Sequence, residues 1–239
     1  MKEKTELFVT HGQSSATGEE GASEWMRGAD AVVLDPCHCS IEAFRQMPVE
    51  HAVISAGDPE RDRIWLEERA CQWVSNEGLE AVAKLRDRWP ELDWVPKLSL
   101  YRPQTNYCFP GPANGEGFSF YTPDTASLRA WRLSNEDISL TEAMALALAM
   151  GFPCLWLHSE TAEFDAKGLD LEMLDKVRGT PLDIWISGGV SDRRHLHNLV
   201  KTGGASAVVV SEKFAREAGV DLLSADLLHK GYSIYDEVH

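Results

Sequence analysis

Short hydrophobic runs alternate with amphipathic stretches along the chain. Eight of the runs predict β-strands, which are Leu7–Thr10, Asp30–Asp35, His51–Ala56, Cys71–Val74, Trp94–Tyr101, Cys154–His158, Ile184–Ile186 and Ala207–Val210. Hydrophobic residues at helical spacing predict helices between them, at Ser40–Met47, Glu77–Trp89, Ala143–Met150, Leu171–Arg178, Asp192–Thr202 and Glu212–Ala218.

Strands that are separated by helices favour a parallel sheet. Strands that are hydrophobic on both faces fit a sheet that helices cover outside and side chains fill inside. Eight such units fit an α/β fold of the (β/α)8 TIM-barrel type, as a single domain over residues 1–239. An open doubly wound sheet is the alternative. The chain contains neither GxGxxG nor GxxxxGKS/T, so the nucleotide-binding forms of that sheet have no support.

The middle of the chain is less regular. Residues 102–127 hold four prolines and no clear hydrophobic period, which predicts a long irregular loop. A hairpin at Gly117–Tyr121 and a short strand at Leu128–Leu133 are the only regular elements that we expect there. Such a loop is either a lid over the mouth of the barrel or a plain insertion.

The net charge of the chain limits which classes of molecule it is expected to bind. The 239 residues include 38 acidic and 23 basic side chains, for a formal charge of −15, and the arginines are interleaved with acids. Such a surface disfavours nucleic acid as a partner. No hydrophobic run is long enough to span a bilayer, and no secretory signal precedes the first strand. With five cysteines, we expect a cytoplasmic protein with free thiols and no membrane partner.

The last third of the chain carries a recognisable pattern. Its segments are Phe164–Asp170, the run Ile186–Asp192 with Ser-Gly-Gly-Val at its centre, and the glycine-led run Gly203–Val210. This pattern resembles the phosphoribosyl isomerase and cyclase barrels of histidine biosynthesis, over about residues 154–212. The resemblance implies a barrel enzyme that binds a phosphorylated sugar-like metabolite.

The Gly188–Gly189 pair predicts an anion site independently of the resemblance. Glycine permits positive φ and a close approach of a ligand to the backbone, and barrels often hold phosphate after strands seven and eight. A tight turn without ligand is the alternative. Ser211 at the end of strand eight joins the predicted site, although Glu212 beside it would repel phosphate. The resemblance implies a second phosphate near Gly57 and Ser75–Asn76.

The resemblance also implies two catalytic aspartates, at the ends of strands one and five. This chain has His11 and Tyr101 there. Our first hypothesis is therefore an isomerase or lyase that uses acid–base chemistry and no organic cofactor, with His11 as base or acid and Asp35 and Glu160 as its partners. The second hypothesis is a barrel that lost catalysis and serves as a binding or regulatory protein.

Strand parity suggests a different chemistry at Lys97. Lys97, Ser99 and Tyr101 share one face of strand five, so Lys97 lies inside the barrel if Tyr101 points into the mouth. A desolvated lysine has a lowered pKa and forms a Schiff base with a carbonyl compound, as in a lyase or aldolase. A lysine paired with Asp35 is the alternative.

Two further groups of residues come from the strand ends. Cys37, His38 and Cys39, with Cys108 and His11, have the residue types of a zinc site, but a lone C-x-C favours free thiols, and we predict no metal. His158, Glu160 and Glu163, near the end of strand six, are candidates for proton transfer, unless they are simply solvated.

Overall fold

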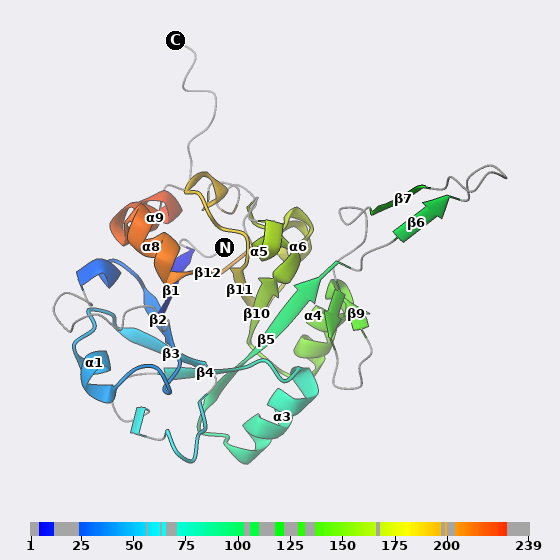
Figure 1. Ribbon diagram of the computed structural model, residues 1–239. Helices are drawn as coiled ribbons and strands as arrows, with labels where there is room; N and C mark the ends of the chain where they lie inside the picture. Colours follow the sequence, from blue (N-terminus) through cyan, green and yellow to red (C-terminus); the bar gives the residue numbers. More distant parts are fainter. Residues whose placement is uncertain are drawn as a thin grey trace, which may run out of the picture.

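The computed structural model describes residues 5–11, 24–55, 57–62, 64–65, 71–102, 106–109, 118–121, 129–131, 137–165, 168–196, 199 and 204–228. Eight parallel strands of this part of the chain form a closed barrel, and helices surround it (Figure 1). The barrel strands are β1 (Glu6–His11), β2 (Ala31–Leu34), β3 (His51–Ser55), β4 (Cys71–Ser75), β5 (Asp93–Tyr101), β10 (Cys154–Ser159), β11 (Asp183–Ser187) and β12 (Ala207–Val210). The fold is consistent with a TIM barrel.

Two contacts between strands far apart in the sequence close the ring. β12 pairs with β1, with Ala207 level with Glu6, and β10 pairs with β5, with Trp156 level with Lys97. All eight predicted strands are therefore present in the described part of the chain, with bounds that differ by at most one residue at either end. The closed order excludes the open doubly wound sheet.

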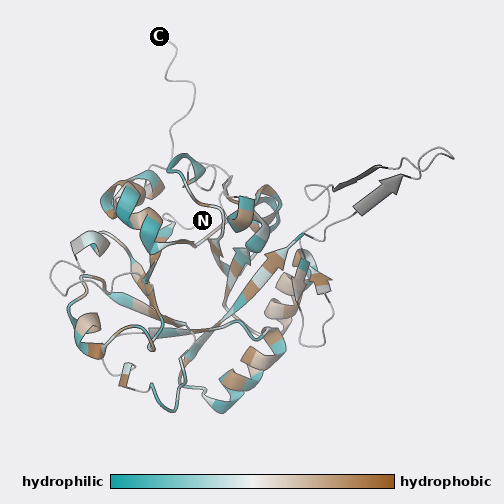
Figure 2. Cartoon of the chain, viewed as in Figure 1, coloured by the Kyte–Doolittle hydropathy of each residue, from teal (hydrophilic) through white to brown (hydrophobic). Residues whose placement is uncertain are grey.

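Helices lie outside the ring. They are η2 (Glu24–Met26), α1 (Ile41–Arg45), α3 (Leu79–Arg88), α4 (Leu140–Ala149), α5 (Glu160–Asp165), α6 (Leu171–Val177), α8 (Glu212–Ala218) and α9 (Val220–Leu228). Ser40, Ser139, Asp170 and Ser211 begin α1, α4, α6 and α8 by accepting hydrogen bonds from backbone N–H groups of the first turn. The helices carry both hydrophobic and hydrophilic residues, as Figure 2 shows, because only one face packs on the strands. No helix of the described ranges is long and hydrophobic enough to cross a membrane.

Alternation along the strands separates two cores. Leu7, Val9 and their equivalents on other strands face the helices and join the larger cluster of buried residues. Phe8, Val53, Trp156, Trp185 and further residues of the same parity fill the barrel interior. The rings of Phe8 and Trp185 meet edge to face with their centroids 4.8 Å apart, and the centroids of Trp156 and Trp185 are 6.3 Å apart. These aromatic side chains close the barrel below the carboxyl ends of the strands.

The segment that we expected to be an irregular loop contains regular structure. β6 (Asn106–Phe109) and β7 (Phe118–Tyr121) form an antiparallel two-stranded sheet, which Figure 1 shows standing away from the barrel. β8 (Arg129–Trp131) then pairs antiparallel with the end of β5 and with β9 (Asp137–Ser139). The short strand expected near Leu128–Leu133 is therefore present, and it extends the sheet at β5.

Candidate active site

A cavity of about 300 Å³ lies at the carboxyl ends of β1, β5, β10, β11 and β12. Its polar lining includes Lys97, His158, Glu163, Ser187 and the Gly188–Gly189 turn. Strand alternation explains the set, because Lys97, His158 and Ser187 all have the parity of the interior residues. Active sites of barrels of this kind lie at the same end.

Lys97 is the most distinctive residue of the cavity. Its Nζ lies 4.4 Å from the ring centroid of Trp156, a cation–π contact on the neighbouring strand. Burial lowers the pKa of Lys97 from its ordinary value, and the Glu163 and Glu160 carboxylates offset part of that effect. A larger share of Lys97 is therefore an uncharged, nucleophilic amine than for a lysine in water.

His158 lines the same cavity as Lys97 and has two hydrogen-bonding partners. Its Nε2 lies 2.8 Å from Glu163 Oε2, and its Nδ1 lies 2.9 Å from Ser187 Oγ. Burial lowers the pKa of His158, the charge of Lys97 lowers it further, and Glu163 and Glu160 act in the opposite direction. The lowered pKa favours the neutral imidazole, which is the form that accepts a proton.

The Gly188–Gly189 turn lines the cavity, but backbone packing alone already requires glycine. The φ angles are +96° and +90°. A Cβ on Gly188 would lie 2.3 Å from the Ser159 carbonyl oxygen, and one on Gly189 would lie 2.1 Å from the Gly168 carbonyl oxygen. Gly168 N–H also donates to the Gly189 carbonyl oxygen, at 3.1 Å. Both interpretations of the glycine pair, tight turn and ligand contact, therefore remain compatible with its position.

His11 stands at the end of β1, where the structure gives it a different partner from the expected ones. Its Nδ1 lies 3.2 Å from Glu212 Oε2, whereas Asp35 and Glu160 were the predicted partners. Glu212 is buried and also pairs with Arg216, whose guanidinium lies 4.3 Å from the ring centroid of Trp25. Glu212 thus faces the positive charge of Arg216, although it was expected to repel an anion. Ser211 lines the cavity, and its Oγ accepts from Phe214 N–H.

The residues that were considered and rejected as a zinc site have contacts of other kinds. Asp35 Oδ2 lies 3.5 Å from His38 Nε2, and Asp35 Oδ1 accepts from Cys37 N–H at 2.8 Å. The alternative pairing of Lys97 with Asp35 is not among the contacts, since Lys97 is influenced by Glu163 and Glu160. In the described ranges no three His, Cys, Asp or Glu side chains are placed to hold a metal ion. The Cys108 side chain is outside the described residues.

The remaining predicted residues do not line this cavity. Gly57 packs against a ring, because a Cβ there would lie 2.8 Å from Trp73 Cζ3. Ser75 accepts from Glu77 N–H, and the exposed Asn76 follows β4. The other two are Tyr101 at the end of β5 and Glu160 at the start of α5. Of these, Glu160 acts on the site through its charge.

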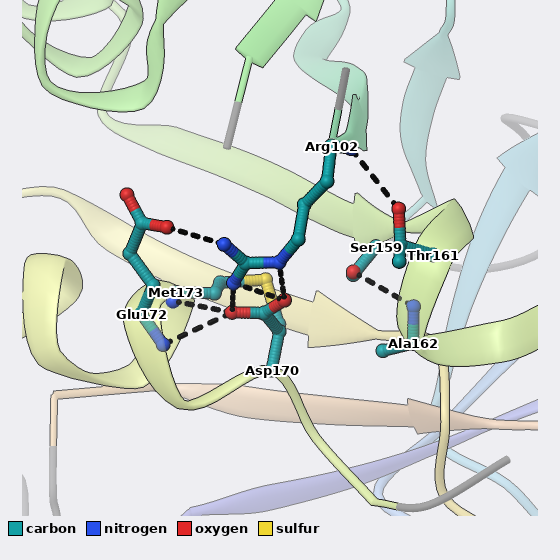
Figure 3. A network of polar contacts seen from close by, with 7 residues as sticks. All are labelled: Arg102, Ser159, Thr161, Ala162, Asp170, Glu172 and Met173. Carbon is teal, nitrogen blue, oxygen red and sulfur yellow. Dashed lines mark hydrogen bonds and ion pairs between the residues drawn. The ribbon is translucent and has the colours of Figure 1, made fainter. Parts of the chain in front are cut away.

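An arginine network holds the end of β5 against α5 and α6 (Figure 3). Arg102 Nη2 donates to both carboxylate oxygens of Asp170 at 2.7 Å, and Nη1 donates to Glu172 Oε2 at 2.8 Å. Arg102 N–H donates to Thr161 Oγ1 at 3.0 Å. Arg102 and Asp170 are 13% and 6% exposed, so the network fixes the strand that carries Lys97 against the helix that carries Glu163.

Comparison with known proteins adds no assignment: no family model matches the chain, and no curated protein matches it.

Sequence reasoning did not single out Ser187, Trp156 or Arg102. Ser187 belongs to the Ser-Gly-Gly-Val motif, in which only the glycines were assigned a role. The signal that identifies it is parity, because Trp185 and Ser187 on β11 lie level with Trp156 and His158 on β10. Arg102 carried no such signal, since Asp170 is 68 residues away.

Proposed function

We propose that this protein is an enzyme that acts on a small carbonyl compound through an imine formed at Lys97. The observation that carries the proposal is the position of Lys97, which lies inside the cavity, 4.4 Å from the Trp156 ring and beside His158 and Glu163. The uncharged amine attacks the carbonyl carbon, a C–N bond forms, and water leaves after proton transfer. The reaction needs no organic cofactor, and cleavage of a bond next to the imine would make it a lyase.

The wall opposite Lys97 supports a phosphorylated, sugar-like substrate. Thr10, Ser191 and Ser211 line the cavity together with the Gly188–Gly189 backbone. Hydroxyl and N–H groups of this kind bind phosphate or sugar oxygens. Lys97 supplies a positive charge in the same cavity. We further propose that the barrel is a single (β/α)8 domain and a relative of the histidine-biosynthesis isomerases, working in the cytoplasm.

Acid–base isomerisation of a phosphorylated sugar, without an imine, is the second candidate. The specific observation in its favour is that His158 and Glu163 face the same cavity as the paired glycines. In that reaction His158 moves a proton between neighbouring carbons, and Lys97 stabilises the negative charge that develops on the carbonyl oxygen.

Borohydride trapping separates the two candidates. The protein is incubated with dihydroxyacetone, glyceraldehyde or the phosphate of either compound, reduced, and digested for mass spectrometry. The imine proposal predicts a stable adduct on Lys97, which is absent in Lys97→Met and present in a Lys84→Met control, because Lys84 is exposed on α3. Absence of an adduct, together with isomerisation of a phosphate, would favour the second candidate.

Thermal shift measurements test the hypothesis of a barrel without catalysis. A ligand that binds only the folded protein raises its Tm. A Tm increase with a phosphorylated compound, with neither adduct nor turnover, would identify a binding protein. An adduct on Lys97 would reject that hypothesis.

A further inference from the structure

The hydrogen bonds around Ser187 determine which atom of the site accepts a proton. Two groups contact its hydroxyl, Trp156 Nε1 at 2.8 Å and His158 Nδ1 at 2.9 Å, and Ser187 also lines the cavity. Ser187 is 6% exposed, and Trp156 is 3% exposed. Bulk water therefore does not compete for these bonds.

The roles of the two His158 nitrogens follow from their partners. A carboxylate of Glu163 only accepts hydrogen bonds, so the 2.8 Å contact places a proton on His158 Nε2. In the neutral imidazole, Nδ1 then carries no proton and must accept. Its partner at 2.9 Å is Ser187, and the hydroxyl of Ser187 is therefore the donor.

The contact with Trp156 determines how the lone pairs of Ser187 Oγ are used. An indole N–H only donates, so it occupies one of the two lone pairs of Ser187 Oγ. The hydroxyl proton is directed to His158, which leaves the second lone pair for a group in the cavity. The oxygen thus has one donor and one acceptor already engaged, and one acceptor site open to a ligand.

We propose that Ser187 is a catalytic residue that relays a proton from the bound carbonyl compound to Nδ1 of His158. The substrate class is a carbonyl compound with a transferable proton, on the carbon next to the carbonyl or on a hydroxyl one carbon further. Ser187 Oγ takes that proton as its own passes to Nδ1. Where the proton leaves carbon, the C–H electron pair is delocalised into the protonated imine at Lys97. Where it leaves the hydroxyl, the oxygen pair forms a new C=O bond, the adjacent C–C bond breaks, and the electron pair of that bond moves into the protonated imine. The reverse transfer returns the proton. This inference rests on the proposed function for its substrate.

After the transfer, every group still has a partner. The imidazolium donates from Nε2 to Glu163 and from Nδ1 to Ser187 Oγ. Ser187 accepts from Trp156 and His158 and donates its new proton to the substrate. An unsatisfied buried polar atom is costly in a protein interior, and the relay leaves none of these atoms without a partner.

The test begins with the protein alone. The ¹⁵N shifts of His158, assigned by its loss in His158→Asn, report the tautomer above the pKa of the residue. The relay predicts a proton on Nε2 in the wild type and in Ser187→Thr, which keeps the hydroxyl. A proton on Nδ1 would overturn the relay, because Ser187 would then accept from His158. This result does not depend on imine formation, so it is distinct from failure of the proposed function.

The second measurement follows deuterium exchange into the α-carbon of dihydroxyacetone and its phosphate. Ser187→Ala should slow exchange by about 100-fold while borohydride still traps Lys97, because only the proton transfer is lost. Ser187→Thr should restore part of the rate. Ser224→Ala removes a hydroxyl on α9 that does not line the cavity, so this variant should exchange like the wild type. Exchange in Ser187→Ala at the wild-type rate would overturn the relay.

Discussion

Removal of the Arg102 guanidinium tests the network that holds β5 against α5 and α6. Arg102→Met keeps most of the side-chain volume and deletes the charge that faces the 6% exposed carboxylate of Asp170. Breaking a buried ion pair by removing one partner costs about 3–5 kcal/mol. The carboxylate keeps the N–H groups of Glu172 and Met173, at 3.0 and 3.2 Å, so the cost should fall to about 2 kcal/mol.

This free energy converts into a measurable shift of Tm. An unfolding entropy of about 2.1 cal/mol/K per residue gives about 0.5 kcal/mol/K for 239 residues. Arg102→Met should therefore lower Tm by about 4 °C, measured by circular dichroism or calorimetry. In a double-mutant cycle with Asp170→Asn, we expect the effects to be non-additive, because each substitution removes the same pair.

Arg194→Met provides the matched control. Arg194 pairs with Asp192 at 2.7 Å but is 84% exposed, so its loss should leave Tm essentially unchanged. Equal shifts for Arg102→Met and Arg194→Met would refute the argument from burial. A Tm of Arg102→Met within about 1 °C of the wild type would do the same.

Three further predictions concern other parts of the protein. Lys97→Met should raise Tm near neutral pH, because a lowered pKa means that folding disfavours the charged amine. That penalty disappears as pH rises toward the ordinary value of 10.5, so the Tm difference between variant and wild type should shrink over the same rise in thermal melts. Gly188→Ala should lower the free energy of unfolding in urea by more than about 3 kcal/mol, because the added Cβ would lie 2.3 Å from a carbonyl oxygen at a positive φ. Gly179→Ala is the control, with φ +78° and open space around it, and should lower the free energy of unfolding by about 1 kcal/mol. Iodoacetamide at pH 8 should label the exposed Cys37 well before Cys39, because burial raises the pKa of Cys39 to about 11; equal rates in peptide mass spectrometry would contradict this.

The barrel was largely predictable because its strands obey a local rule. Each strand is a short hydrophobic run between polar segments, and the order of strands and helices favours a parallel sheet. Lys97 was placed inside by the same rule, since parity in β5 depends only on neighbours in the sequence. The α5 helix and the β6 strand were not anticipated, because they lie next to prolines, glycines or charged residues without a clear period; β7 lies where a hairpin at Gly117–Tyr121 was expected.

The partners within the site could not be predicted, because they depend on contacts across the closed ring. His11 and Glu212 are adjacent only because β12 pairs with β1. Ser187 and His158 meet because β10 and β11 run side by side in one particular register. A shift of that register by one residue would turn one of the two side chains outward. Such long-range pairing leaves no mark in the local pattern of residues.

The aromatic side chains that fill the barrel below Lys97 determine how a compound can enter and leave the cavity. Because Phe8, Trp156 and Trp185 block the barrel from below, a compound that reaches the amine must leave by the route it entered. The cavity therefore has a single opening, and two molecules cannot pass one another inside it. In the proposed reaction, the product and the next substrate molecule would therefore use the same opening, and we expect competitive inhibition by product.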